Sequence, residues 1–346
     1  MATHPTPAPL HLKGAPGSPY TRKMLALLRY RRIPYAFLVG NEADRLGLPK
    51  PRVELLPTFY LPNAAGELEA VVDSTPLIRR FEAEFEGRSA IPPDPVTAFL
   101  DALVEDYADE WLTKCMFHYR WAFAADVEKA GRILPLWRDR SVDDVRHAEL
   151  ARGFSERQIS RLYVVGSNEV TAPVIEASYV RFLALFERLV AARPFVFGDR
   201  PGASDFGLYA QLTQLTHFDP TPMGLCLEQA PRVYAWVDVV EDLSGVPDDA
   251  AWLPRTALRD ALGELLAEIG RVYVPALLAN AEALRAGKEQ WETTIDGRPW
   301  TQPSFPYQGK CLAALRAGFE ALGGEDRSAV RAVLADTGCE PLFTGL

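Results

Sequence analysis

The hydrophobic pattern of the chain changes its period near residue 90, and this change limits the possible folds more than any other feature. Residues 10–86 alternate short apolar runs, typical of strands, with amphipathic stretches typical of helices. Residues 87–95 (GRSAIPPDP) are rich in proline, and beyond them almost every apolar pattern has the helical period. The sequence therefore predicts a small α/β domain followed by a larger all-helical domain.

The order of the elements predicted in the first unit indicates a particular fold. These elements are strand, helix, strand, strand, strand and helix, at residues 10–12, 19–31, 35–39, 58–61, 69–72 and 76–86. The first two strands are joined through a helix, so they are expected to be parallel, whereas the next two are joined by a hairpin-like turn. This βαβ then ββα order is the arrangement of the thioredoxin-like fold.

Three regions are predicted along the chain. They are a thioredoxin-like domain at residues 10–88, an all-helical domain at 96–245 and a helical extension at 246–346. The helical runs that define the second region are residues 97–119, 142–163, 174–192 and 233–243. The proline-rich residues 87–95 form the linker between the first two regions.

The extension is expected to pack on the second domain. Leu262, Leu265 and Ile269 recur at spacings that leave one helix face in need of burial. The linker at residues 244–249 is too short to act as a free tether. The segment 290–308, rich in Trp, Pro and Thr, is interpreted as a loop that interrupts the helices of the extension.

Charge and cysteine content exclude several classes of protein. The 346 residues carry a formal net charge of −9, so the surface is expected to repel nucleic acids and anionic membranes. No apolar run reaches the roughly 20 residues of a membrane span, and residues 1–9 lack the apolar core of a signal peptide. The four cysteines form no close pair, which argues against a zinc site or a redox pair. We therefore expect a cytoplasmic protein with reduced thiols, no metal and no nucleic-acid or membrane partner.

The first candidate site lies where the helix at residues 19–31 begins. Ser18 and Pro19 are residue types preferred at a helix N-cap and at the first helical position, so they require no function. A hydroxyl beside free N–H groups at a positive helix end also stabilises a bound anion such as a thiolate. These residues alone leave both interpretations open.

The second candidate is Pro57, directly before the strand at residues 58–61. A trans proline that opens an edge strand is the ordinary interpretation. A cis peptide bond would instead leave the backbone of Leu56 free to pair with a peptide-like ligand.

The third candidate is Asp73-Ser74-Thr75, where the chain leaves a strand and enters a helix. Hydroxyl residues and acids are preferred helix caps, which is a sufficient structural explanation. The same groups have the chemistry to bind a carboxylate at Ser74 and the helix N-terminus, and an ammonium group at Asp73.

In order and spacing, the three motifs resemble the glutathione-binding domain of the cytosolic glutathione transferases. The matching residues are Ser18, Pro19 and Tyr20 after the first strand, Leu56 and Pro57 before the third strand, and Asp73 and Ser74 before the last helix of the unit. The resemblance covers roughly residues 10–243, and the extension lies outside it.

The helical domain contributes one further motif to this resemblance. Residues 198–206 (GDRPGASDF) look like the buried helix-capping segment of the family. Gly202 takes the cap position, where the family has a hydroxyl residue, and glycine is still a tolerable cap. Asp205 is a folding residue in this interpretation.

The resemblance implies a site for glutathione, bound as a cosubstrate without a metal. Ser18 would be the catalytic residue, with its hydroxyl facing the glutathione sulfur. The other residues implied to bind glutathione are Tyr20, Leu56, Pro57, Asp73, Ser74 and Thr75.

Each part of glutathione has an implied partner. The backbone of Leu56, before a cis-Pro57, would pair with the cysteinyl residue. Asp73 would hold the amine of the glutamyl residue, and Ser74 and Thr75 its carboxylate.

A cation from the segment before the third strand would meet the glycyl carboxylate. Lys50 and Arg52 are both available, and the sequence does not choose between them. Residues 40–54 also depart from the family pattern, because they carry proline and charge instead of a clear helix.

The activity implied is that of a glutathione transferase acting on a small apolar electrophile or a peroxide. Serine at position 18 disfavours thiol–disulfide exchange through a protein thiol. The second substrate is expected between Ser18 and the helix at 97–119, with Trp111, Phe117 and Tyr119 as apolar walls. The alternative is a binding or assembly module that keeps the fold without the chemistry. Since family members are commonly homodimers, a homodimer is the expected state.

Overall fold

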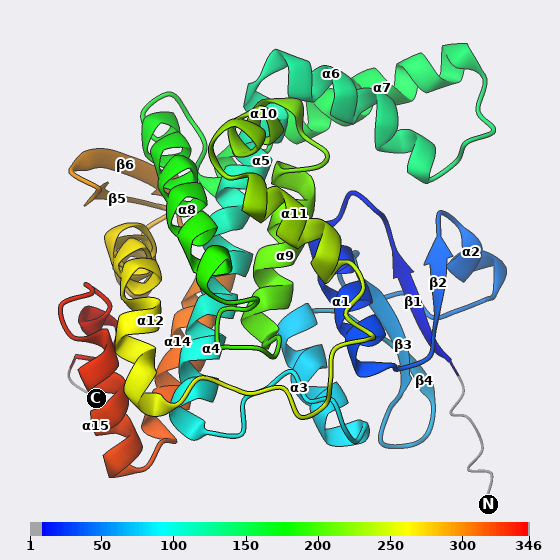
Figure 1. The fold of residues 1–346 in the computed structure, drawn as a ribbon. Coiled ribbons are helices and arrows are strands. Elements are labelled where there is room, and N and C mark those ends of the chain that lie inside the picture. Colours follow the sequence, from blue (N-terminus) through cyan, green and yellow to red (C-terminus); the bar gives the residue numbers. More distant parts are fainter. Residues whose placement is uncertain (1–8, 345–346) are drawn as a thin grey trace, which may run out of the picture.

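The computed structural model describes residues 9–344. The segment in which we looked for a signal peptide therefore lies outside the described residues, apart from Pro9. A small α/β domain lies beside a larger helical part (Figure 1). This arrangement confirms the predicted fold class, a thioredoxin-like domain followed by an all-α domain.

The N-terminal sheet has four strands in the order β2-β1-β3-β4. The strands are β1 (Leu10–Gly14), β2 (Tyr35–Val39), β3 (Thr58–Pro62) and β4 (Leu68–Val71). β1 pairs in parallel with β2, as predicted, and antiparallel with β3, which in turn pairs antiparallel with β4.

Two long helices and one short helix complete this domain. They are α1 (Pro19–Arg31), α2 (Glu42–Arg45) and α3 (Ser74–Glu84). α1 begins at Ser18, whose hydroxyl accepts a hydrogen bond from the Thr21 N–H. α2 has only four residues, in agreement with the absence of a clear helical pattern there.

The helical part begins with one long helical run and continues through helices of very different exposure. In chain order its elements are α4 (Pro95–Tyr107), η1 (Ala108–Leu112), α5 (Thr113–Ala122), α6 (Ala124–Ile133), η2 (Pro135–Trp137), α7 (Asp144–Ile159), η3 (Leu162–Val165), α8 (Ala172–Ala192), α9 (Ala203–Leu215), α10 (Pro220–Gln229) and α11 (Pro231–Val240). The run predicted as one helix at 97–119 is α4 and α5 joined by the π-helical turn η1. α9 is buried along its whole length because it packs between α1 and α4.

The start of α9 has the predicted capping arrangement. Gly202 is the N-cap, and the buried Asp205 carboxylate accepts hydrogen bonds from the N–H groups of Val196 and Gly202, both at 2.9 Å. These bonds tie the loop before α9 to the first turn of a helix that contacts both domains.

Asp205→Ala is expected to lower the free energy of unfolding by about 2 kcal/mol, because two buried N–H groups lose their acceptor. Chemical denaturation measures this loss. Asp205→Asn keeps one acceptor oxygen and should lose less. Equal stability of the Ala variant and the parent would show that the cap is not needed.

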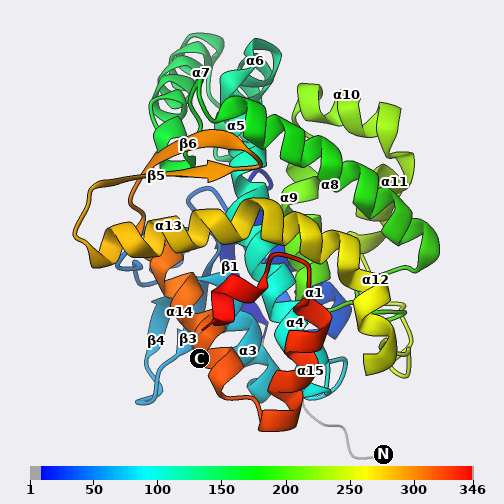
Figure 2. The same cartoon turned by 90° about the vertical axis from the view of Figure 1, so that its left-hand side faces the viewer.

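Residues after 254 form a third group of elements that covers α4 and α8 (Figure 2). These elements are α12 (Arg255–Glu268), η4 (Ile269–Tyr273), α13 (Val274–Arg285), β5 (Gln290–Ile295), β6 (Arg298–Pro303), α14 (Pro306–Glu320), α15 (Gly324–Leu334) and η5 (Glu340–Phe343). Their buried apolar residues belong to the same continuous core as those of the sheet and of α4, α8 and α9.

The interpretation of residues 290–308 as a loop is wrong. β5 and β6 form an antiparallel hairpin, with Trp291 and Trp300 buried at 4% and 1% exposure. The turn is Asp296–Gly297, where φ is 51° and 71°. Two positive φ angles in a two-residue turn match the twist of the flanking strands in a β-hairpin. This turn therefore allows the segments on either side of it to pair as strands.

Among residues 9–344, no helix combines the length and apolar character that a membrane crossing requires. The same residues contain no group of three or more His, Cys, Asp or Glu side chains placed to hold a metal ion.

Candidate functional site

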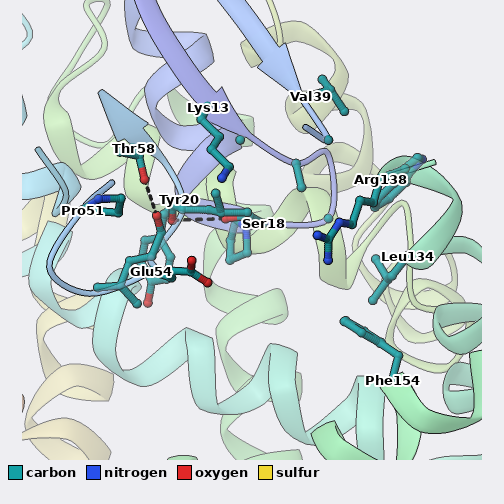
Figure 3. Close-up of a pocket in the computed structure, with 18 of the residues that line it drawn as sticks. Lys13, Ser18, Tyr20, Val39, Pro51, Glu54, Thr58, Leu134, Arg138 and Phe154 are labelled. Carbon is teal, nitrogen blue, oxygen red and sulfur yellow. Dashed lines mark hydrogen bonds between the residues drawn. The ribbon is translucent and has the colours of Figure 1, made fainter. Parts of the chain in front are cut away.

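A cavity of about 800 Å³ opens between the α/β domain and the helical part (Figure 3). On the α/β side it is lined by the ends of β1 and β2, the start of α1 and the segment before β3. On the helical side it is lined by α5, η2 and α7. Ser18, Tyr20 and Leu56 all lie in its wall.

Ser18 offers its hydroxyl at the N-terminus of α1. The oxygen accepts from the Thr21 N–H at 3.3 Å, and the hydroxyl donates to the Leu56 carbonyl at 3.4 Å. A hydrogen bond of 3.4 Å is long and therefore weak. The proton of this hydroxyl can be redirected to a stronger acceptor in the cavity at little cost.

The loop that holds Ser18 is fixed from the helical side. The guanidinium of Arg120, on α5, donates to the Gly17 carbonyl at 3.2 Å. Arg120 is itself held by the buried Asp219 carboxylate at 2.9 Å. A side chain at position 17 would overlap Trp137 and Leu134, so the helical wall lies directly against this loop.

Tyr20 lines the cavity, but its hydroxyl already makes hydrogen bonds within the protein. It donates to the Asp109 carbonyl at 2.8 Å and approaches the Thr113 hydroxyl at 3.4 Å. Burial, together with the charges of Glu110 and Asp109, raises the pKa of Tyr20 well above its ordinary value. Of the Ser18 and Tyr20 hydroxyls, that of Ser18 is therefore the one available to a ligand.

The Leu56–Pro57 peptide bond is cis. Local residues alone favoured the trans form, and the structure has the form that the family resemblance implies. Leu56 lines the cavity together with Lys50, whereas Arg52 is exposed outside its lining. This placement favours Lys50 over Arg52 as a partner for an anion in the cavity.

Asp73, Ser74 and Thr75 lie at the start of α3 and do not line the cavity. Ser74 is 5% exposed, and no described residue hydrogen-bonds its hydroxyl. Asp73 has a φ of 84°, in the left-handed region that residues other than glycine rarely adopt. Such strain concentrates at functional sites.

Thr75 belongs to a buried ionic network under the start of α3. Its hydroxyl accepts from Lys23 at 3.3 Å and donates to Glu105 at 3.1 Å. The Lys23 ammonium, with no exposed surface, lies 2.7 Å from Glu105 and 2.5 Å from Asp109. The network links α1, α3 and the helical part, so Thr75 has a structural role whether or not it meets a ligand.

The charges of this network depend on its neighbours. Burial alone would lower the pKa of Lys23, but Asp109 and Glu105 outweigh it and raise that pKa. Burial alone would raise the pKa of Glu105, but the charges of Arg79 and Lys23 hold it at about 2. Lys23 and Glu105 therefore form a charged pair at neutral pH, whereas burial raises the pKa of the third member, Asp109.

A side chain of the extension contacts the residue that precedes α3. The Tyr307 hydroxyl, on α14, donates to the Asp73 carboxylate at 2.9 Å. No local sequence pattern predicts this contact, because the two residues are far apart in the chain. None of the residues that line the cavity comes from segment 290–308.

The apolar wall of the cavity differs from the one expected. Phe117 lines it, but Trp111 and Tyr119 are buried in the core at 0% and 2% exposure. The other large apolar residues in the wall are Met116, Trp121, Leu134, Trp137 and Phe154. Most of these come from α5, η2 and α7, which pack together as a separate small apolar cluster.

The cavity is rich in basic residues, although the protein is acidic. Its lining contains Lys13, Lys50, Arg120, Arg138, Arg157 and Arg161, against the two carboxylates Asp44 and Glu54. Sequence reasoning considered only Lys50 among these six. The other five basic residues belong to no local motif, and they line one cavity because the fold brings separate segments together.

Family comparison agrees with this geometry. Residues 12–89 match the family model "Glutathione S-transferase, N-terminal domain", and residues 137–238 match "Glutathione S-transferase, C-terminal domain". Together the two matches span just over half of the chain. The chain belongs to the glutathione S-transferase family. Its extension beyond residue 238 lies outside both matches.

The chain is also similar to solved structures of glutathione S-transferases. One is from Methylobacterium radiotolerans and was solved in complex with glutathione sulfonate. It is 18% identical in sequence, the TM-score is 0.40, and the match covers 70% of this chain and 97% of that chain. Another is from Pseudomonas fluorescens and has two glutathione molecules bound. It is 14% identical, the TM-score is 0.40, and the match covers 69% of this chain and 89% of that chain. No curated protein matches this family member significantly.

Proposed function

We propose that the protein is a glutathione transferase that uses the Ser18 hydroxyl to activate bound glutathione for attack on a small electrophile or a peroxide. The observation that carries this proposal is the position of Ser18. Its hydroxyl lies in the cavity wall, at the positive end of α1, with only a 3.4 Å bond to the Leu56 carbonyl. It can therefore turn to a bound sulfur.

The chemical task is to ionise a thiol. A free cysteine thiol, with a pKa of about 8.5, is only a few per cent thiolate at pH 7. A hydrogen bond to an ion is worth about 1.5 to 3 kcal/mol, which lowers a thiol pKa by roughly one to two pH units. One hydroxyl at the end of a helix is therefore sufficient.

Glutathione would extend from the cavity toward the start of α3. We place its cysteinyl residue against the backbone of Leu56 and its sulfur at Ser18, with Tyr20 as a wall. The glycyl carboxylate would meet Lys50, the one of the two candidate cations that lines the cavity. The unpartnered hydroxyl of Ser74 supports its role at the glutamyl carboxylate.

Ser74→Ala is expected to weaken glutathione binding by roughly tenfold, which corresponds to one charge-assisted hydrogen bond. Isothermal titration calorimetry with glutathione measures the change. The control is Ser89→Ala, outside the cavity lining, which should keep the parent affinity. If Ser74→Ala binds as tightly as the parent, the glutamyl end lies elsewhere.

One observation favours the second candidate function, a non-catalytic binding or assembly module. Asp73, which would hold the glutathione amine, already accepts a hydrogen bond from Tyr307 of the extension. In that case the extension would occupy the glutamyl end and serve another partner.

Two measurements separate these functions. Calorimetry should show saturable binding of glutathione, and a generic electrophile such as 1-chloro-2,4-dinitrobenzene should be conjugated faster than without protein. No binding at millimolar glutathione would contradict the transferase and favour the module.

Two further proposals concern the state of the protein in the cell. We propose the cytoplasm as its compartment, supported by four free cysteines, the state typical of reducing compartments. We also propose a homodimer, as is common among members of this family. Light scattering coupled to size exclusion tests the second proposal directly.

A further inference from the structure

We propose that the second substrate of this site is an organic anion, an electrophile that carries a carboxylate or a similar negative group beside an apolar body. This inference rests on the proposed function, because it assigns the part of the cavity that glutathione would leave free. It depends on the charges and apolar residues that α5, η2 and α7 bring to one wall.

The excess of positive charge in the cavity is not balanced by ion pairs. Arg120 is neutralised by Asp219, its partner at 2.9 Å. The remaining cations, Lys13, Lys50, Arg138, Arg157 and Arg161, have no acidic partner among the described residues. A chain with a net charge of −9 thus concentrates unpaired cations at one cavity, which favours anionic ligands.

Glutathione would use only the cations of the α/β side. Lys50 precedes β3 and would meet the glycyl carboxylate. Lys13 is on β1, and its side chain points toward Ser18 in Figure 3, where the sulfur would lie. The three arginines come from the opposite, helical wall.

The arginines of the helical wall are arranged on one face. Phe154 is followed on α7 by Arg157 three residues later and by Gln158 four residues later. Arg161, just beyond the end of α7, lies four residues after Arg157. Such spacings place side chains on the same face of a helix, and here that face lines the cavity. Arg138, just after η2, extends its guanidinium into the same cavity (Figure 3).

This charged face lies beside an apolar surface that borders the sulfur site. Trp137 and Leu134 pack directly against Gly17, next to Ser18. Phe117 and Phe154 continue the apolar wall from α5 and α7. A substrate with an apolar reactive body near Ser18 and an anionic group farther out satisfies both surfaces. The planar guanidinium groups suit a carboxylate, which they can bind through two parallel hydrogen bonds.

A pair of matched probes tests this preference. In 4-chloro-3,5-dinitrobenzoate, the glutathione thiolate forms a bond to the carbon that carries chlorine, chloride leaves with the bonding electron pair, and the thiol proton passes to solvent. The neutral amide, 4-chloro-3,5-dinitrobenzamide, has nearly the same size and reacts in the same way. After correction for the uncatalysed rates, we expect kcat/KM to favour the carboxylate at least fivefold.

The arginines are tested by variants that remove one charge each. Arg138→Gln and Arg157→Gln should each lower kcat/KM severalfold more for the carboxylate than for the amide. Arg152→Gln is the matched control, because Arg152 is exposed on α7 but does not line the cavity. Since all three side chains are exposed, the variants are expected to fold, and circular dichroism checks this.

A binding measurement separates this proposal from the proposed function. Calorimetry compares unreactive 3,5-dinitrobenzoate with 3,5-dinitrobenzamide, with and without saturating S-methylglutathione. Tighter binding of the benzoate, reduced by salt and by the two arginine variants, supports the anion site. Equal affinity for the two probes, or a preference that survives in the Arg138→Gln/Arg157→Gln double variant, overturns it. Failure of S-methylglutathione to bind would count against the transferase, while the benzoate titration still decides the anion site.

Discussion

Removal of residues 244–346 is expected to yield aggregated or sharply destabilised protein. The buried side chains Leu258, Leu262 and Leu266 of α12 belong to the same core as α4 and α8. Truncation would expose the apolar surfaces of α4 and α8 that the extension covers, together with Trp111, which packs on Trp300 at 5.3 Å between ring centroids. Large exposed apolar patches lead to aggregation.

Size exclusion and thermal unfolding of the truncated chain measure this effect. The control is a full-length protein cleaved by a protease at a site introduced in residues 244–249, which keeps the extension in place without its covalent link. That cleaved protein should remain soluble. A truncated protein with the melting temperature and the glutathione binding of the parent would show that the extension is an independent appendage.

Ser18→Ala is expected to reduce turnover at pH 7 by roughly ten- to a hundredfold and to leave glutathione affinity nearly unchanged. The hydroxyl is expected to stabilise the thiolate more than the thiol, so its loss affects the fraction of ionised sulfur and not the binding of the rest of the tripeptide. Steady-state kinetics with 1-chloro-2,4-dinitrobenzene and calorimetry measure the two quantities separately.

Tyr20→Phe is the matched control for this variant. It also removes a hydroxyl from the cavity wall, but one that is donated to the Asp109 carbonyl at 2.8 Å. Turnover should therefore stay within a few-fold of the parent. A larger loss of turnover for Tyr20→Phe than for Ser18→Ala would show that Ser18 is not the residue that activates the sulfur.

Much of the fold could be predicted because local signals and tertiary structure agree. Helix 19–31 was predicted with the boundaries that the structure has, since Ser18 and Pro19 mark its start. The hairpin β5–β6 was missed although its signal was present. Asp296–Gly297 is a typical hairpin turn, and Trp291 and Ile295 alternate with more exposed residues. The prolines around this turn are typical of loops, and they account for the incorrect prediction.

The site could be predicted only where its residues mark the ends of helices and strands. Ser18, Leu56 and Ser74 stand at such ends, so their positions follow from the order of elements. Arg138 and Tyr307 do not, because their roles depend on how distant segments meet. Trp111 shows the reverse case: a large aromatic residue near the site in sequence is buried in the core, where its indole N–H donates to Ser178 at 3.1 Å. Packing decides which face of a helix meets a cavity.

Titration of the thiol of bound glutathione tests the central claim most directly. The ultraviolet absorbance of the thiolate, followed against pH at saturating glutathione, gives the thiol pKa in the complex. We expect it to lie roughly one to two pH units below that of free glutathione and to return toward the free value in Ser18→Ala. A bound thiol that titrates like free glutathione in the parent protein, or a lowered pKa that persists without the Ser18 hydroxyl, would contradict the proposed activation by Ser18.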